Sequence, residues 1–472
     1  MKSHVVLALD IGASNGRGIL GFYTPEGTLE RMEEIHRFEN TFVRVNGGLY
    51  WDYMRIYRGI LDCLHVCKKR NVALDCIGLD AWSQDYAYIG WDGEVLGLPR
   101  CYRDPVNEAH ARDFERELGL DSLAHARKSG AGFNSISTFR QLWYDRSHRT
   151  GVFDAARWIL YIPYLLVYLL TGVVGYDDSL PAIGEQCDAD TLRYSEDTAT
   201  VLGVLDKTPP RFCRGNILGR TNRSVFEETG YDAIPVACTD AHDTASAVSA
   251  IPDESNFLWI SSGSFNMFGA VLNAPALDDR LLARGFINTR LGDGRVCLMG
   301  GGAGMYYIQQ CMRHWNEQGL RLSYPALTKY ALAHRTDRFF AFDDVPDAAL
   351  DMPQALNAAI QRAGFASAES PYELYAVFCN SLARLTTRDL IHLEGTLGRK
   401  FERVYIVSGG AQADAVNLSM ADMLDRPIYA GLTEAAATGN LLAQLSALGA
   451  IKDKQQAITA VKNITEMRRF GK

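Results

Sequence analysis

The sequence predicts an α/β protein built from two domains. Its 472 residues are too many for a single hydrophobic core and suffice for two domains of ordinary size. Predicted strands and helices alternate along the whole chain, which is typical of the α/β class. Each half also opens with a strand, a turn of small residues and a returning strand, so the architecture is predicted to be duplicated.

The first half begins with an apolar run, Val5–Leu9, that predicts a buried strand. The segment Asp10–Gly16 follows as a turn of small residues, and Arg17–Tyr23 predicts the second strand. Further along, Tyr53–Arg70 has a helical pattern, and Val72–Asp80 predicts another strand. Tyr86–Leu96 then predicts a hairpin, because Asp92-Gly93 is a preferred dipeptide for a tight turn.

The second half repeats this pattern without repeating the residues. Phe257–Ile260 predicts a strand, residues 261–264 a small-residue turn, and Phe265–Leu272 the returning strand. Val404–Val407 predicts a later strand that leads through Ser408-Gly409-Gly410 into a helix over about 413–424. The Pro- and acid-containing stretch 249–256 has the composition of a linker, so the predicted domains are residues 1–248 and 249–472.

Composition and charge exclude several classes of protein. With 47% hydrophobic and 22% charged residues the chain is globular, and a formal net charge of -8 argues against a broad nucleic-acid-binding surface. The most apolar segment, Trp158–Leu170, is too short for a membrane span and contains Pro163. We therefore expect a cytoplasmic protein without nucleic-acid or membrane partners. The ten cysteines show no paired Cys-x-x-Cys units, so we expect reduced thiols and no zinc site.

Asp10 and the small residues after it could serve phosphate chemistry. A carboxylate at the carboxyl end of a buried strand suits Mg²⁺, which takes oxygen ligands and keeps most of its waters. Small residues from Gly12 to Gly16 can turn backbone N–H groups toward phosphate oxygens, and Arg17 adds a fixed positive charge. The same residues equally fit an ordinary hairpin capped by Asp10.

Two turns in the second half also fit a nucleotide site. Ser262-Gly263-Ser264 offers hydroxyls and backbone donors to an anion, although Ser/Gly turns are common in any fold. Gly409-Gly410 ends a strand before a helix, where glycine lets a ring or a phosphate approach the backbone. The motif lacks G-x-G-x-x-G spacing, which favours an adenosine platform over a dinucleotide site.

The stretch Ala241–Ala247 places His242 and Asp243 at the head of a small-residue helix. Phosphoryl transfer to an alcohol needs a base within hydrogen-bond reach of the hydroxyl, and Asp243 could be that base. A capping role fits the pattern as well, because Asp is a frequent N-cap. Trp82–Asp85 combines an aromatic ring with polar side chains, as sugar sites do, while a lone Trp82 would more often be a core residue.

Taken in order along the chain, these blocks resemble the FGGY family of carbohydrate kinases, and within it most closely the rhamnulokinases. The resemblance runs from Leu7 to about Leu445 and includes Leu9–Ser14, Glu34–Phe38, Tyr102–Asp104, Leu169–Gly172, His242–Val248, Ser261–Gly263, Asp422, Glu434-Ala435 and Gly439-Asn440. It implies two actin-like (ribonuclease H-like) domains with a nucleotide and sugar cleft between them. It also implies ATP as phosphate donor, Mg²⁺, and a small ketose as acceptor.

The resemblance assigns expected roles to individual residues. Asp243 becomes the catalytic base and Asp10 the residue near the magnesium ion. The expected ATP contacts are Ala13, Ser14, Asn15, Gly16, Arg17, Ser264, Gln309, Gly409 and Gly410. The expected sugar contacts are Trp82, Ser83, Gln84, Asp85, His242, Thr244 and Gly301.

Departures from the rhamnulokinase pattern concentrate in the sugar site. The usual Thr-Trp-Gly-Val-Asp reads Ala81-Trp82-Ser83-Gln84-Asp85, and an expected asparagine is matched by Gly301. In the nucleotide site, the usual Thr-Trp after Ser-Ser-Gly is Ser264-Phe265, and a three-glycine run reads Ser408-Gly409-Gly410. We expect phosphorylation of L-rhamnulose, with another ketose such as fuculose or xylulose as the same-class alternative. An actin-like nucleotide switch is the alternative from a different class, and a monomer or homodimer is expected.

Overall fold

A computed structural model describes residues 2–346, 349–464 and 466–471. The chain divides into two compact units, each made of segments that are distant in sequence. The first unit comprises residues 1–254, 272–299 and 435–465, and the second comprises 255–271, 300–434 and 466–472. The chain passes from the first unit to the second between Glu254 and Ser255, inside the stretch with linker composition. Two later segments return to the first unit, which a single cut between 248 and 249 does not anticipate.

The first unit is built on a six-stranded sheet with the order β12-β13-β6-β1-β2-β3. Its central strand β1 (His4–Ile11) pairs antiparallel with β2 (Asn15–Tyr23) and parallel with β6 (Cys76–Ala81). The other strands are β3 (Leu29–Glu39), β12 (Ile217–Arg220) and β13 (Pro235–Ala237). Both β1 and β2 are longer than their apolar patterns predict, so the turn between them shrinks to three residues.

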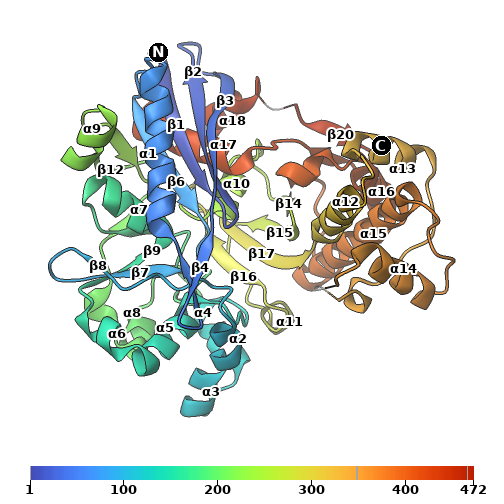
Figure 1. Ribbon diagram of the computed structural model, residues 1–472, viewed down its shortest axis with the longest axis horizontal. Coiled ribbons are helices and arrows are strands. Elements are labelled where there is room, and N and C mark those ends of the chain that lie inside the picture. Colours follow the sequence, from blue (N-terminus) through green and yellow to red (C-terminus); the bar gives the residue numbers. More distant parts are fainter. Residues whose placement is uncertain (1, 347–348, 465, 472) are drawn as a thin grey trace. The chain divides into compact units, whose positions relative to one another are not determined.

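Both faces of β1 are buried, because successive side chains of a strand point to opposite faces. Leu7, Leu9 and Ile11 join the core on the side of helix α1 (Tyr53–Lys69). Val6 and Ala8 join a second core together with helix α17 (Ala435–Ala447). Figure 1 shows α1 lying along this sheet. The continuous apolar run in the sequence is thus explained by a strand covered on two sides.

Smaller elements of the first unit surround this sheet. Two hairpin strands, β7 (Tyr86–Ile89) and β8 (Val95–Leu96), confirm the predicted turn at Asp92-Gly93, and β9 (Trp158–Tyr161) completes their sheet. The apolar segment 158–170 divides into β9 and helix α7 (Ile162–Thr171), with Pro163 in the first helical turn. Among the described residues, no helix is long and apolar enough to cross a bilayer.

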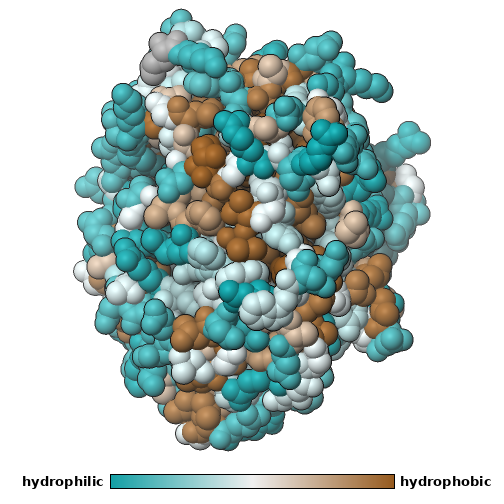
Figure 2. Space-filling model, turned by 90° about the vertical axis from the view of Figure 1, so that its left-hand side faces the viewer, coloured by the Kyte–Doolittle hydropathy of each residue, from teal (hydrophilic) through white to brown (hydrophobic). Residues whose placement is uncertain are grey.

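Other elements of the first unit have these bounds. The remaining strands are β4 (Phe42–Val45), β5 (Gly48–Trp51), β10 (Tyr176–Asp177), β11 (Arg211–Phe212) and β16 (Ile287–Arg290). The remaining helices are α2 (Pro105–His110), α3 (Asp113–Leu118), α4 (Ser122–Ser129), α5 (Thr138–His148), α6 (Thr150–Ala155), α8 (Glu196–Leu202), α9 (Arg223–Thr229), α10 (Asp243–Ser249), α11 (Asp279–Leu282) and α18 (Lys454–Val461). One face of the molecule, drawn in Figure 2, is mostly hydrophilic with separate hydrophobic patches.

The second unit carries the strand order β15-β14-β18-β19-β20. These strands are β14 (Leu258–Ser262), β15 (Phe265–Leu272), β18 (Val404–Val407), β19 (Ile428–Ala430) and β20 (Arg468–Phe470). β14 pairs antiparallel with β15 and parallel with β18, as β1 does with β2 and β6. The duplicated pattern in the sequence therefore corresponds to equivalent strand pairings in the two units.

Helices of the second unit follow the predicted α/β alternation. They are α12 (Tyr306–Glu317), α13 (Tyr324–Ala333), α14 (Met352–Arg362), α15 (Pro371–Leu397) and α16 (Asp414–Leu424). Strand β17 (Val296–Ala303) begins in the first unit and ends in the second. All ten cysteines are free thiols. Cys213 is exposed and the other nine are buried, so most of the cysteines serve as small core residues.

Candidate active site

Asp10 is the second-last residue of β1 and lies next to the turn that follows this strand. The register of the sheet gives it two charged neighbours. Across the antiparallel pair it lies opposite Arg17, and across the parallel pair it lies beside Asp80. The Arg17 guanidinium donates to one Asp10 carboxylate oxygen, from Nη2 at 2.7 Å and from Nε at 3.0 Å. Arg17 therefore orients this carboxylate and offsets part of its charge.

The turn after β1 is held by Asn40. Its Nδ2 donates to the Gly12 carbonyl at 2.8 Å, and its backbone N–H donates to the Ser14 carbonyl at 3.1 Å. Ala13 and Ser14 lie in this turn, whereas Asn15, Gly16 and Arg17 already belong to β2. A Cβ on Gly16 would lie 2.3 Å from the Phe38 ring, so that glycine is required by packing. The Asn15 amide oxygen accepts from Arg37.

Asp243 is the first residue of α10, and His242 is its N-cap residue, without a capping hydrogen bond from its side chain. His242, and not Asp243, therefore occupies the N-cap position, so the alternative in which Asp243 is the N-cap of this helix is wrong. Its Oδ1 accepts from the backbone N–H and the hydroxyl of Thr244, and its side chain is 33% exposed. Burial, reinforced by the Asp10 carboxylate, raises the pKa of Asp243 to about 6.

The His242 imidazole lies beside this carboxylate, with Nε2 3.5 Å from an Asp243 oxygen. Its side chain is almost completely buried, and burial lowers the pKa of His242 to about 3. The ring is therefore neutral at physiological pH, and its buried Nδ1 has no hydrogen-bond partner among the residues that the structure describes. A neutral imidazole can accept or donate one hydrogen bond at each nitrogen, depending on its tautomer.

Asp80 is a buried carboxylate that the sequence reasoning did not single out. It is completely buried in β6, where one oxygen accepts from Asn440 Nδ2 at 2.6 Å and the other has no partner in the described part of the chain. Burial, together with the charges of Asp10 and Asp243, raises its pKa well above the ordinary value. One signal was available: an acid within the otherwise apolar strand Ile77–Ala81.

Helix α17 fixes the position of α10. A Cβ on Gly439 would lie 1.9 Å from the Ser246 carbonyl oxygen, so the two helices meet where only glycine fits. The Ser246 hydroxyl donates to the Ala436 carbonyl at 2.8 Å. Asn440 follows directly and reaches Asp80, so one turn of α17 supports both Asp243 and Asp80. This explains a matching pair, Gly439-Asn440, that the resemblance included without a stated role.

The predicted sugar segment Trp82–Asp85 is largely buried. Both Trp82 Nε1 and Trp51 Nε1 donate to Asp85, whose oxygens also accept from the Tyr102 backbone and Gln141. Asp85 therefore holds several segments of this unit together through hydrogen bonds. Its direct contact with a sugar stays a prediction. Burial raises the pKa of Asp85 to about 6 against the lowering effect of these donors.

Ser83 and Gln84 behave differently from their neighbours. Ser83 is fully buried, and within residues 2–346, 349–464 and 466–471 its hydroxyl has no hydrogen-bond partner. Gln84 is half-buried, and its backbone carbonyl accepts from Thr138 Oγ1 and Gln141 Nε2. These bonds fix the backbone of the segment and leave the side-chain amide outside that network.

In the second unit, a pocket of about 260 Å³ is lined by residues that include the predicted nucleotide contacts Gln309, Gly409 and Gly410. Other lining residues are Gly263, Met305, Tyr324, Thr328, Tyr375, Gln412 and Ala413. Ser264 Oγ donates to Gln309 Oε1 at 2.8 Å, so this predicted pair is in contact. Gly409 has open space where a side chain would be, whereas a Cβ on Gly410 would lie 2.0 Å from Ser262 Oγ.

Gly301 lies exposed near the end of β17. A Cβ built there would meet only the Met267 sulfur, at 3.7 Å. The site therefore has room for a side chain, and packing does not require the glycine that stands where the resemblance expects asparagine.

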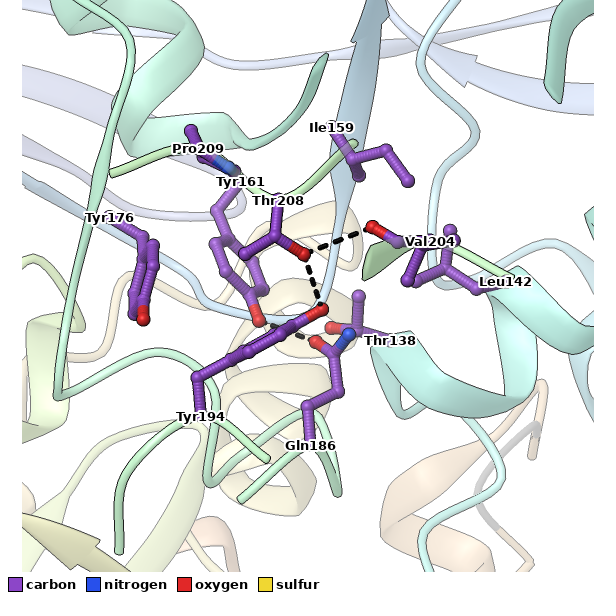
Figure 3. Close-up of a pocket in the computed structure, with 10 residues that line it drawn as sticks. All are labelled: Thr138, Leu142, Ile159, Tyr161, Tyr176, Gln186, Tyr194, Val204, Thr208 and Pro209. Carbon is purple, nitrogen blue, oxygen red and sulfur yellow. Dashed lines mark hydrogen bonds between the residues drawn. The ribbon is translucent and has the colours of Figure 1, made fainter. Parts of the chain in front are cut away.

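A separate cavity in the first unit is too small for a sugar. Figure 3 shows Tyr161, Gln186, Tyr194 and Thr208 around it, with hydrogen bonds linking Tyr161 to Gln186 and Thr208 to Tyr194. Its volume of about 20 Å³ accommodates little more than a water molecule. It therefore does not compete with the carboxylate cluster as a substrate site.

Comparison with known proteins identifies the family. Residues 258–448 match the model of the FGGY family of carbohydrate kinases, C-terminal domain. A rhamnulokinase from Bacteroides thetaiotaomicron is 30% identical over 450 residues, covering 94% of this chain and 91% of that protein. The chain belongs to the FGGY family of carbohydrate kinases. It is accordingly a sugar kinase, an enzyme that uses ATP to phosphorylate a small-molecule sugar.

Other FGGY relatives and neighbours agree with this assignment. A rhamnulokinase from Oceanobacillus iheyensis is 28% identical over 475 residues, covering 99% of this chain and 98% of that protein. A ligand-bound xylulose kinase structure from Lactobacillus acidophilus superposes with a TM-score of 0.78 at 14% identity, covering 99% of this chain and 94% of that one. A gluconate kinase structure from the same organism also gives 0.78. These likenesses confirm the predicted two-domain, actin-like α/β fold.

Proposed function

We propose that this FGGY kinase phosphorylates L-rhamnulose at its primary hydroxyl, giving L-rhamnulose 1-phosphate and ADP. The observation that carries the proposal is Asp243, a partly exposed carboxylate at the start of α10. The full-length relatives named rhamnulokinase support the choice of ketose. We further propose that the enzyme serves carbohydrate catabolism in the cytoplasm as a monomer or homodimer.

Asp243 acts as the general base in this proposal. As the bond between the sugar oxygen and the γ-phosphorus forms, the bond from that phosphorus to the β–γ bridging oxygen breaks, and the sugar hydroxyl gives its proton to an Asp243 oxygen. The raised pKa of about 6 leaves the group ionised at neutral pH, yet basic enough to take the proton. Thr244, which donates to Oδ1, orients the carboxylate.

Mg²⁺ fits the charge distribution around Asp10. Asp10 raises the pKa of both Asp80 and Asp243, so these carboxylates repel one another, and Arg17 offsets only part of that charge. Asp10 would hold the ion largely through its waters, because Mg²⁺ needs only one or two protein carboxylates. When bound, the ion would neutralise phosphate charge during transfer.

Nucleotide contacts are assigned here for each unit by itself. In the second unit we assign Ser264 and Gln309: Ser264 Oγ donates to Gln309 Oε1, and the Gln309 amide N–H groups can donate to a phosphate oxygen. Gly409 has open space where a side chain would be, and it lines the 260 Å³ pocket together with Gly410, so a ligand can approach the backbone there. From the first unit we assign Ala13, Ser14, Asn15, Gly16 and Arg17 to the phosphates.

Most of the residues that we assign to the sugar belong to the first unit. Neutral His242, with its unpartnered Nδ1, suits a sugar hydroxyl. The other residues that we assign to the sugar are Trp82, Ser83, Gln84, Asp85, Thr244 and Gly301.

Another ketose, such as fuculose or xylulose, is the second candidate substrate. It is favoured by Ser83, whose buried hydroxyl lacks a protein partner, and by the Gln84 amide outside the backbone network. A buried polar group without a partner costs about 1–3 kcal/mol, so a substrate hydroxyl that satisfied it would be selected.

A panel of ketoses and deoxyketoses tests this proposal. ADP release should be fastest, by kcat/KM, with L-rhamnulose. A higher kcat/KM for a more hydroxylated ketose would transfer the assignment to the second candidate. Activity with none of the sugars, together with slow ATP hydrolysis alone, would favour an actin-like nucleotide switch.

A further inference from the structure

Ser408 holds a backbone conformation that is costly for any residue with a side chain. Its φ is 68° and its ψ is -172°, a region populated almost entirely by glycine. The turn is fixed on both sides, since the Ser408 N–H donates to the Leu432 carbonyl and its own carbonyl accepts from Ala411 N–H. Such a residue persists only where its surroundings over-determine it, and it is most often found at functional sites.

The Ser408 side chain has a partner in a second segment. Its hydroxyl lies 3.0 Å from the hydroxyl of Ser261, at the end of the neighbouring strand β14. Ser261 directly precedes Ser262-Gly263-Ser264, and Ser408 directly precedes Gly409-Gly410. The hydroxyl pair therefore connects the two turns that contribute Gly263, Gly409 and Gly410 to the 260 Å³ pocket.

A second contact joins the same turns. Gly410 packs against Ser262 so closely that a Cβ would lie 2.0 Å from Ser262 Oγ. The first turn is also anchored to α12, because Ser264 Oγ donates to Gln309 and the Ser264 carbonyl accepts from Tyr306 N–H. Within this unit, the contact between Ser261 and Ser408 completes a series of contacts that begins at α12. The series runs through the turn Ser262–Ser264, here called the phosphate turn, to the turn Ser408–Gly410, here called the nucleoside turn.

We propose that Ser261 and Ser408 form a nucleotide-positioning pair that fixes the spacing between the phosphate turn and the nucleoside turn. Gly263, Gly409 and Gly410 line the pocket rather than the two serines themselves, so the pair acts by holding the backbone of the two turns. The backbone cost at Ser408 is offset by this pairing, which glycine could not provide. The inference rests on the proposed assignment of this pocket to ATP.

Four variants separate positioning from simple stability: Ser408→Ala, Ser408→Gly, Ser261→Ala and the double change Ser261→Ala/Ser408→Ala. Each should raise the KM for ATP roughly fivefold, the factor that one neutral hydrogen bond of average strength accounts for. The kcat and the KM for the sugar should stay within about twofold, because the base and the sugar residues are untouched. The double variant should be no worse than either single variant, since both remove the same bond.

Thermal unfolding of the same proteins provides an independent readout. Ser408→Gly should have a higher Tm than Ser408→Ala, because glycine accepts the positive φ without strain. The two variants should nevertheless share the same raised KM for ATP, which separates the hydroxyl from the backbone. A wild-type KM in Ser408→Gly, or additive effects in the double variant, would overturn the proposal. A wild-type enzyme that does not use ATP would instead refute the proposed function, while the unfolding data would still report on the pair.

Discussion

Arg17 and Asp10 face each other across the first two strands, with the guanidinium 2.7 Å from the carboxylate. The arginine is thereby held at the carboxyl end of β1, where we propose that it serves both the carboxylate and the nucleotide phosphates. A bifurcated contact to one oxygen leaves the other carboxylate oxygen for a different partner. Because Asp10 and Arg17 are partners in the antiparallel pair of β1 and β2, the residue predicted to bind magnesium lies beside the residue predicted to bind phosphate.

Replacing this arginine should weaken use of ATP. Arg17→Gln removes a charged hydrogen bond worth about 1.5–3 kcal/mol, so kcat/KM for ATP should fall by roughly 10- to 100-fold. Arg70→Gln is a matched control, because Arg70 pairs with Glu33 on the surface, where such pairs contribute little. Steady-state kinetics at varied ATP check this. Equal values for the two variants would contradict a role for Arg17 at the phosphates.

The contact between α10 and α17 should be sensitive to a single methyl group. Gly439→Ala would place a Cβ 1.9 Å from the Ser246 carbonyl oxygen, and overpacking of this kind costs about 1–3 kcal/mol. Gly395→Ala in α15 is the control: its Cβ meets no atom within 4 Å, so alanine should stabilise the helix by about 0.5–1 kcal/mol. Urea unfolding measures both. A Gly439→Ala protein as stable as wild type would contradict this close helix contact.

Activity should rise with pH through the acidic range. The base works only when ionised, and the pKa of Asp243 is raised to about 6, so kcat/KM should increase between about pH 5 and 7 and then level off. His242 should contribute no step there, because its pKa is lowered to about 3 and the ring stays neutral. Kinetics across this range, at constant ionic strength, check the limb. A flat profile from pH 5 to 7 would argue against Asp243 as the ionising base.

Sugar selection should depend on Ser83 and Gln84. The double change Ser83→Gly/Gln84→Val removes two groups that can bind extra hydroxyls, so the ratio of kcat/KM for L-rhamnulose over any more hydroxylated ketose should rise. Competition between the two sugars gives this ratio directly. An unchanged ratio would mean that Gln84 points away from the sugar, and plain rhamnulokinase activity would be the better interpretation.

Much of the fold could be predicted because each pattern reflects one local cause. The strand Phe265–Leu272 and the strand Val404–Val407 have the predicted bounds, and the hairpin turn lies at Asp92-Gly93. The first turn is shorter than the sequence predicts. Asn15 and Gly16 have no apolar side chain to indicate a strand, but both belong to β2, which is held by backbone hydrogen bonds. The returning segments of the first unit were missed for a similar reason: long-range packing of α17 leaves no local signal.

The site was predicted less completely than the fold. Asp10 and Asp243 stand at recognisable element boundaries, whereas the sequence signal at Asp80, an acid within an apolar strand, does not place it beside Asp10 and Asn440; strand register and a hydrogen bond do. The strain at Ser408 is likewise a property of the backbone that composition does not show. Asp85 looked like a sugar ligand, and its four donors come from segments far apart in the sequence.

The most direct test of the account is the rate of ADP release from ATP with L-rhamnulose, compared between wild type and Asp243→Asn. Without the base, the attacking hydroxyl keeps its proton, so kcat should fall by roughly two to four orders of magnitude while nucleotide affinity stays nearly unchanged. Asp62→Asn, a surface change on α1, should behave as wild type. Near-normal turnover in Asp243→Asn would contradict the account.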